Sequence, residues 1–233
     1  MKINILTLYP EMFPGFLGYS LAGKALSEKK VELNVVNIRD FATDNYKSVD
    51  DTPFGGGAGM VMKPSVLDRA IQAVYKTGPL YYLSPRGEVF NQQKAHEFAL
   101  CEEMTFLCGR FEGVDERVIE KWGIKEISIG DFILSGGEPA LLTMLDSVIR
   151  LIPDVMGNKE SSLEESFENG LLEYPQYTKP QNWEGRLVPE VLLSGHHAKI
   201  NAWRLAQSEE ITQQRRPDLW TRYLAQKKIK KGF

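Results

Sequence analysis

Three loops of the sequence carry residue types that could hold a small ligand. Each loop follows a short apolar run and ends in glycine or polar residues; the loops span residues 83–87, 109–115 and 129–138. In an open α/β sheet, ligands bind beyond the carboxyl ends of the strands, so loops of this kind can converge on one pocket. One such loop alone is more often an ordinary strand-to-helix turn, whereas three together favour a cofactor site.

Two other glycine-containing segments nearly match nucleotide-binding signatures. Residues 18–24 match the start of a phosphate-binding loop, but Ala25 stands where a Ser or Thr hydroxyl would hold Mg²⁺, which leaves only a weak case for a nucleotide-phosphate transferase. Residues 55–60 resemble a dinucleotide-binding turn, but Met60 replaces the third glycine and a polar loop precedes it. Four glycines in five positions indicate either close approach of the backbone to a ligand or partner, or a structural turn.

Other common catalytic and metal-binding arrangements are missing from the sequence. His96, His196 and His197 lack the spacing of metal ligands, and no serine lies in a nucleophile-elbow sequence. Cys101 and Cys108 form no CxxC pair, which favours a reducing compartment. The first apolar run is too short for a signal peptide, and no run approaches the roughly 18 apolar residues of a membrane span. We therefore expect a cytoplasmic protein with no membrane segment and no recognisable metal site.

The charge of the chain is unevenly distributed, although its net value is only −3. Residues 1–169 include 17 basic and 25 acidic residues, whereas residues 170–233 include 11 basic and 6 acidic ones. The positive C-terminal part could bind a nucleic-acid backbone, or it could be a solvated helical face with a lysine-rich tail. Segments 174–180 and 214–217 combine cations with aromatic rings or proline, which occur both at RNA contacts and in connections between helices.

The three loops need a sheet to position them, and the apolar pattern predicts one. Short β-branched or apolar runs alternate with helical patterns through the first two thirds of the chain, which indicates an α/β layer with a mostly parallel sheet. The expected strands are residues 2–8, 31–37, 80–83, 105–108 and 126–129. The expected helices are residues 20–28, 64–75, 91–100, 115–122 and 139–151.

The pattern changes after residue 152. Residues 153–170 include a polar stretch that is typical of a linker. Beyond it, residues 189–194, 198–208 and 217–226 have helical patterns, so we expect a small α-helical C-terminal domain.

Taken together, these segments resemble the bacterial tRNA (guanine-N1) methyltransferases. The resemblance includes the run Cys-Gly-Arg-Phe-Glu-Gly-Val-Asp-Glu-Arg at 108–117 and extends, in order, over nearly the whole chain. The matching segments are residues 10–13, 39–41, 49–60, 83–85, 108–117, 128–131, 136–138, 166–167, 177–180 and 192–197.

The resemblance implies a fold and a reaction. The fold is a SPOUT-type α/β fold with a mostly parallel sheet and a deep trefoil knot, plus a small α-helical C-terminal domain. Residues 1–152 would bind S-adenosylmethionine, residues 153–170 would be a flexible linker, and residues 171–233 would bind tRNA. The reaction is methyl transfer from S-adenosylmethionine to N1 of the guanosine immediately 3′ of the anticodon, position 37 of the tRNA. The family also implies a cytoplasmic homodimer whose subunits share active sites.

The resemblance also assigns the cofactor site. The matching positions are Tyr82, Leu83, Ser84, Pro85, Gly109, Phe111, Glu112, Ile129, Gly130, Asp131, Phe132, Ile133, Leu134, Gly136 and Gly137. The family commonly works with Mg²⁺, for which the sequence locates no site.

The resemblance assigns the catalytic pair to Glu165 and Arg150, and it assigns contacts with tRNA to Asp50 and Lys179. Methylation of N1 requires removal of its proton, which a carboxylate can accept. Negative charge then grows toward O6, where a guanidinium can stabilise it. The family usually has Asp where this chain has Glu165, and the adjacent Glu164 is an alternative base. A noncatalytic tRNA-binding relative is the alternative function.

Overall fold

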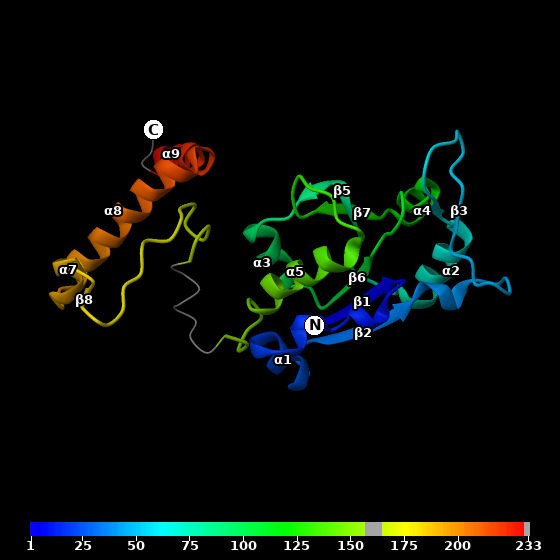
Figure 1. Cartoon of the computed structure of the whole chain (residues 1–233), viewed down its shortest axis with the longest axis horizontal. Helices are drawn as coiled ribbons and strands as arrows, with labels where there is room; N and C mark the ends of the chain where they lie inside the picture. The colour runs from blue at the N-terminus through cyan, green and yellow to red at the C-terminus, as the bar shows by residue number, and fades with distance from the viewer. Residues whose placement is uncertain (157–164, 231–233) are drawn as a thin grey trace. The chain divides into compact units, whose positions relative to one another are not determined.

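The computed structural model describes residues 1–156 and 165–230. The chain forms two compact units, Met1–Gly157 and Asn158–Phe233, and each is considered by itself (Figure 1). Glu164 lies outside the described residues.

The N-terminal unit is built on a five-stranded sheet. Its strands are β1 (Lys2–Thr7), β2 (Glu32–Asn37), β5 (Leu80–Val89), β6 (Glu103–Leu107) and β7 (Lys125–Ser128). Their order is β2-β1-β6-β5-β7, and every neighbouring pair is parallel. The prediction of an α/β fold with a mostly parallel sheet is therefore confirmed. The trefoil knot stays a prediction.

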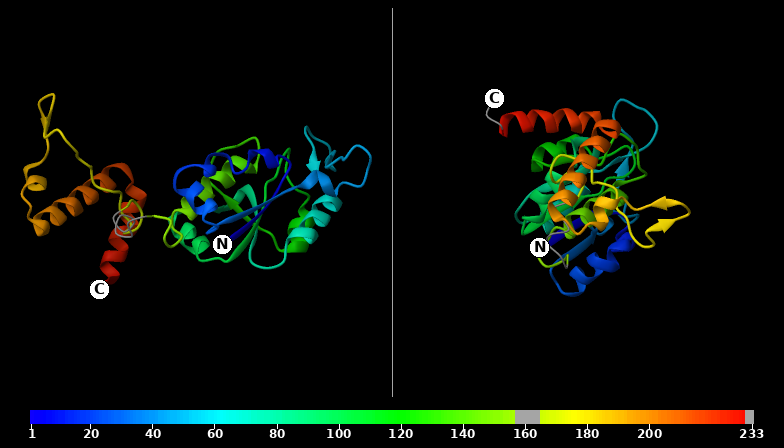
Figure 2. Two further views of the ribbon diagram at one scale, coloured as in Figure 1. Left: turned by 90° about the horizontal axis from the view of Figure 1, so that it is seen from below. Right: turned by 90° about the vertical axis from the view of Figure 1, so that its left-hand side faces the viewer.

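Helices cover both faces of this sheet (Figure 2). Successive strand residues point to opposite faces, so Ile5 belongs to one apolar cluster and Leu6 to the other. The first cluster includes residues of α1 (Ser20–Ser27), α3 (Gln92–Ala99) and α5 (Gly137–Ile149). The second includes residues of α2 (Pro64–Val74) and α4 (Glu116–Trp122). Residues 83–87, expected as a loop, lie within β5 where its pairing with β7 shifts, and the other two loops follow β6 and β7. The strands that carry all three segments are thus held between two packed layers.

Local sequence signals explain where several helices begin and end. Pro64 is the first residue of α2, where its missing N–H costs no intrahelical bond. The Asn91 side chain caps α3 by accepting a hydrogen bond from the Lys94 amide at 3.0 Å. Helix α4 ends at Trp122 and is capped by Gly123, which adopts the left-handed conformation with φ of 58°.

Shorter elements complete the N-terminal unit. They are the 3-10 helices η1 (Pro10–Met12), η2 (Gly15–Gly18) and η3 (Ile38–Phe41) and the antiparallel pair β3 (Asp50–Asp51) and β4 (Val61–Met62). The segment that resembles a phosphate-binding loop spans η2 and the start of α1. Gly23 packs against the Gly18 carbonyl, so close helix packing accounts for the glycine at position 23.

The C-terminal unit consists mainly of helices. They are α7 (Glu190–Leu193), α8 (His197–Arg215) and α9 (Pro217–Lys230), with a hairpin of β8 (Asn182–Trp183) and β9 (Arg186–Leu187). Glu209 of α8 accepts hydrogen bonds from the Tyr223 hydroxyl and the Lys227 ammonium of α9, each at 2.7 Å. Among the residues that the structure describes, no helix has the length and apolar character needed to cross a membrane.

Candidate functional site

The three loops converge on one pocket at the carboxyl end of the sheet. The pocket has a volume of about 240 Å³. Its walls include every position that the resemblance assigned to the cofactor except Asp131, whose side chain is exposed outside the lining. Six other residues also line it: Arg110, Gly113, Ile127, Ser128, Ser135 and Ala140. Five of these residues lie within two positions of an assigned residue in the sequence, and Ala140 lies about one helical turn after Gly137. They could therefore have been predicted by extending the three loops by a few residues.

The first loop is anchored by a charged network. The Arg86 guanidinium lies 2.9 Å from a Glu116 carboxylate oxygen and 3.0 Å from one of Glu126. These hydrogen bonds raise the pKa of Arg86 above its usual value. The Ser84 hydroxyl accepts a hydrogen bond from the Arg86 amide at 3.2 Å, which shapes the turn at the pocket wall.

Two glycines allow the loops to pass close to their neighbours. A Cβ atom at Gly109 would collide with the ring of Tyr82, whose hydroxyl pKa is raised by burial. A Cβ atom at Gly137 would lie 2.9 Å from the Cys108 Cα and 3.1 Å from the Leu83 Cβ. The Gly137 amide donates to the Gly109 carbonyl at 3.1 Å, so the second and third loops are joined directly.

We expect Gly137→Ala to destabilise the protein and to reduce binding of S-adenosylmethionine strongly. The added methyl group meets backbone atoms, which cannot move aside as a flexible side chain would, and overpacking of this kind typically costs about 1–3 kcal/mol. Thermal unfolding and calorimetric titration with S-adenosylmethionine would measure both effects. Gly18→Ala is the matched control, because a Cβ atom there meets only Pro14 Cγ at an ordinary 3.5 Å. Equal behaviour of the two variants would contradict the prediction.

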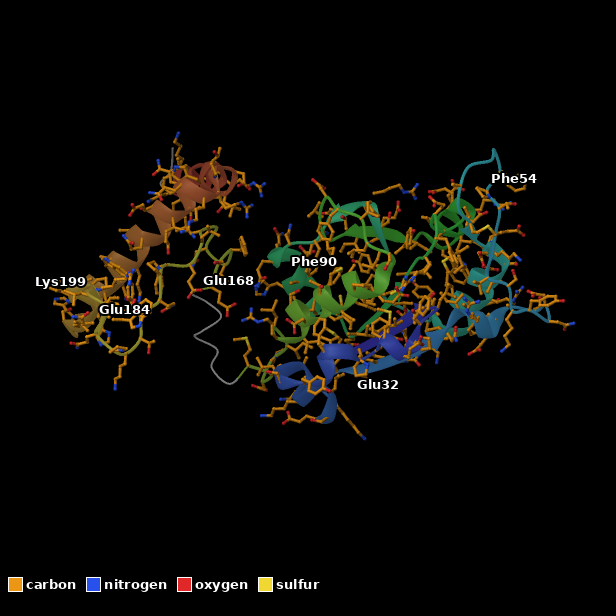
Figure 3. All side chains as sticks on the ribbon, viewed as in Figure 1. Glu32, Phe54, Phe90, Glu168, Glu184 and Lys199 are labelled. Atoms are coloured by element: carbon orange, nitrogen blue, oxygen red, sulfur yellow. The ribbon has the colours of Figure 1, made fainter. Side chains whose placement is uncertain are left out.

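The glycine-rich loop at 55–60 contacts the second loop. The Glu112 amide donates to the Met60 carbonyl at 2.9 Å, and a Cβ atom at Gly59 would collide with the Glu112 side chain. Gly55, Gly56, Gly57 and Gly59 all have positive φ, between 79° and 116°. The positive φ values support the turn explanation, and the close approach at Gly59 is to another segment of this chain. Approach of this loop to a ligand or partner stays a prediction. Phe54, at the start of this loop, is fully exposed (Figure 3).

Asp50 lies in β3, at the base of the same loop. Lys63 supports this segment, since its ammonium donates to the Ser48 hydroxyl at 2.8 Å and lies 3.7 Å from an Asp51 carboxylate oxygen. Asp50 pairs with Met62 of β4, and the Met62 amide donates to the Gly113 carbonyl at 2.9 Å. Asp50 is thus connected through two backbone contacts to the loop that lines the pocket.

The two proposed catalytic residues belong to different units. Arg150 follows the last turn of α5, where its amide donates to the Asp146 carbonyl at 3.4 Å. A cation is favoured at that end of a helix. Glu165 lies in the C-terminal unit, and Lys179 is exposed in the same unit.

Glu165 lies at the start of a compact turn within the predicted linker. The Phe167 amide donates to the Leu171 carbonyl at 2.8 Å, and the Leu172 amide donates to the buried Thr212 hydroxyl of α8 at 2.8 Å. Glu165 lines a second pocket, of about 490 Å³. The other lining residues are Asn169, Leu171, Leu172, Tyr174, Asn201, Arg204, Leu205, Ser208, Tyr223, Gln226 and Lys227.

Among the described residues, no group of three or more His, Cys, Asp or Glu side chains could hold a metal ion.

Comparison with known proteins relates this geometry to a family. The tRNA (Guanine-1)-methyltransferase family TrmD matches residues 1–222. A tRNA (guanine-N(1)-)-methyltransferase of Rhodospirillum rubrum is 59% identical over 226 residues, which cover 97% of this chain and 95% of the relative. A protein of the same name from Ruegeria sp. is 55% identical over 97% of this chain and 94% of the relative. Another from Brucella ovis is 58% identical over 94% of this chain and 91% of the relative. The chain therefore belongs to the tRNA (guanine-1)-methyltransferase family.

Proposed function

We propose that this protein transfers a methyl group from S-adenosylmethionine to N1 of guanosine 37 in tRNA, the nucleotide immediately 3′ of the anticodon. One observation carries the proposal: three loops from separate strands bring together all but one of the fifteen positions assigned to the cofactor. Membership of the family, whose relatives are named for guanine N1 methylation of tRNA, supports the same reaction.

The proposed cofactor fits the chemistry of this pocket. Its walls combine apolar side chains such as Leu83 and Ile129 with glycines where the backbone can approach a ligand closely. Glu112 adds a carboxylate, which suits the positively charged methionine end of S-adenosylmethionine. When bound, S-adenosylmethionine supplies an electrophilic methyl group.

We assign the chemistry at the guanine to one residue from each unit. Glu165 accepts the N1 proton, because N1 must carry a lone pair when it attacks the methyl group. Arg150 stabilises the negative charge that grows at O6, since a guanidinium stays protonated throughout the reaction. Glu165 has one methylene more than the aspartate usual in the family, and the turn at residues 165–171 is the element that would aim its carboxylate.

The remaining parts of the proposal concern the substrate and the assembly. Asp50 reads the guanosine that precedes the target, and Lys179 contacts the tRNA. The protein is a cytoplasmic homodimer in which the linker, residues 153–170, and the tRNA-binding domain, residues 171–233, of one subunit complete the site of the knotted domain, residues 1–152, of the other. Two apolar side chains of the pocket wall support an association of this kind, because they remain exposed in the single chain: Phe132 is 52% and Ile133 81% exposed.

The proposal is tested by incubating the protein with methyl-labelled S-adenosylmethionine and unmodified bulk tRNA. We expect label in 1-methylguanosine after digestion to nucleosides. Tight tRNA binding without transfer would instead support a noncatalytic relative, and label in another nucleoside would contradict the proposed target.

A further inference from the structure

A buried ion pair lies beneath the cofactor loops. Glu138, in the first turn of α5, has no exposed side-chain surface, and its Oε2 lies 3.2 Å from Nε of Arg110. Its other oxygen accepts a hydrogen bond from the Thr7 hydroxyl at 2.7 Å. Burying a carboxylate is costly, and apolar residues of similar volume often stabilise a fold as well as a buried ion pair does. A contribution to stability therefore does not by itself explain the presence of this buried ion pair.

The other contacts of Arg110 explain its position better. Its guanidinium donates to the Ser135 carbonyl of the third loop at 2.9 Å and lies 4.3 Å from the centre of the Tyr9 ring. Gly136 has no room for a Cβ atom because the Arg110 side chain occupies that space. Arg110 itself belongs to the second loop. One side chain thus connects two cofactor loops with the end of β1.

Hydrogen bonds through Thr7 connect Glu138 to strand β1. The Thr7 hydroxyl that donates to Glu138 also accepts a hydrogen bond from the Tyr9 amide at 3.0 Å. Thr7 is fully buried in β1, the strand that pairs with both β2 and β6. Glu138 therefore fixes Arg110 relative to the sheet, and Arg110 fixes the third loop relative to the second.

We propose that Arg110 and Glu138 are positioning residues, which hold the second and third loops in the conformation that binds S-adenosylmethionine. The inference rests on the proposed function of the pocket and adds two residues to it. Arg110 lines the pocket but takes no step in methyl transfer, and Glu138 acts only through Arg110 and Thr7. Loss of the pair should affect the cofactor and leave tRNA binding unchanged.

The test compares full-length variants by calorimetric titration with S-adenosylmethionine, thermal unfolding and steady-state kinetics. Arg110→Lys and Glu138→Gln keep the size of each side chain but remove the guanidinium fork or the charge. Each variant weakens the charged contacts that hold the two loops, and each tenfold change in affinity corresponds to about 1.4 kcal/mol, so we expect Kd and KM for S-adenosylmethionine to rise roughly ten- to a hundredfold. The kcat at saturating cofactor and the Kd for tRNA should change much less.

Two further variants separate positioning from stability. The double variant R110M/E138L replaces the ion pair with apolar side chains and is expected to fold, yet to bind S-adenosylmethionine as weakly as the single variants. Asp68→Asn is the matched control, because it breaks the 2.6 Å ion pair between Asp68 of α2 and Lys121 of α4, away from the pocket. We expect this control to lower the melting temperature without changing the Kd for S-adenosylmethionine.

The outcomes are distinct. A double variant that is folded and binds S-adenosylmethionine with wild-type affinity would overturn the positioning role while leaving the proposed function intact. Wild-type protein that does not bind S-adenosylmethionine would overturn the proposed function together with this inference. Weak cofactor binding by the double variant, with normal binding by Asp68→Asn, is the result we expect.

Discussion

Glu165→Gln is expected to abolish methyl transfer while leaving the affinities for S-adenosylmethionine and tRNA close to those of the wild-type protein. Glutamine preserves the size of the side chain but cannot accept the N1 proton, and loss of a general base typically costs about 10² to 10⁴ in rate. Single-turnover kinetics measure the chemical step directly. Calorimetric titration of the same variant measures cofactor binding, which depends on loops in the other unit.

Glu168→Gln is the control for this substitution. Glu168 lies in the same turn, where its amide donates to the Glu165 carbonyl at 3.4 Å, so the two changes disturb the same local structure. We expect the control to retain methyl transfer. Undiminished transfer by Glu165→Gln would remove Glu165 as the base, and Glu164 would become the residue to replace next.

A heterodimer of one Arg150→Ala subunit and one Glu165→Gln subunit is expected to recover activity that both homodimeric variants lack. Removal of a group that stabilises transition-state charge typically costs about 10² to 10³ in rate, so neither variant should work alone. If each site takes Arg150 from one subunit and Glu165 from the other, the heterodimer has one intact site and one that lacks both residues. Its activity should be about half that of the wild-type dimer.

Coexpression with two different affinity tags and sequential purification would isolate the heterodimer. A dimer in which both subunits carry Glu165→Gln, one with each of the two tags, is the control for contamination with wild-type protein. An inactive mixed heterodimer, with the dimer confirmed by light scattering, would mean that both residues come from one subunit. A monomeric wild-type protein would contradict the shared site altogether.

The sheet was largely predictable from the sequence, and the main exception has a local cause. The strand was expected to end at Leu83, where the first loop begins, whereas β5 continues to Val89. Its pairing with β7 shifts between Leu83 and Glu88, which accommodates the turn, and Gly87 lets the resumed strand pass against the backbone of Ile127. Propensity cannot anticipate a strand that resumes after an interruption, because the reason lies in the neighbouring strand.

The C-terminal helices illustrate the strength and the limit of local signals. The prediction of a helix at residues 198–208 is confirmed by α8, but the predicted end was too early. The helix continues to Arg215, directly before the pair Arg216-Pro217. Pro217 disfavours helical conformation at the residue before it, which was a better stop signal than the loss of apolar periodicity. The hairpin of β8 and β9 was not predicted, since its strands have two residues each.

The sequence predicted the parts of the candidate site that depend on the backbone of the loops, but not the contacts between side chains. The glycine-rich loops identified the pocket, but Arg110 and Glu138 were missed because their contact joins residues far apart in the sequence. Asp131 is exposed and does not line the pocket, so its contact with the cofactor stays a prediction. Arg150 and Glu165 followed from family resemblance alone, since no periodicity relates a helix end in one unit to a turn in the other.

The most direct measurement is methyl transfer from S-adenosylmethionine to two tRNA transcripts that differ only at position 37, with guanosine in one and adenosine in the other. The account predicts 1-methylguanosine in the first transcript and no methylated product in the second. Methylation of both transcripts, or of a nucleotide other than guanosine 37 in the first, would contradict it.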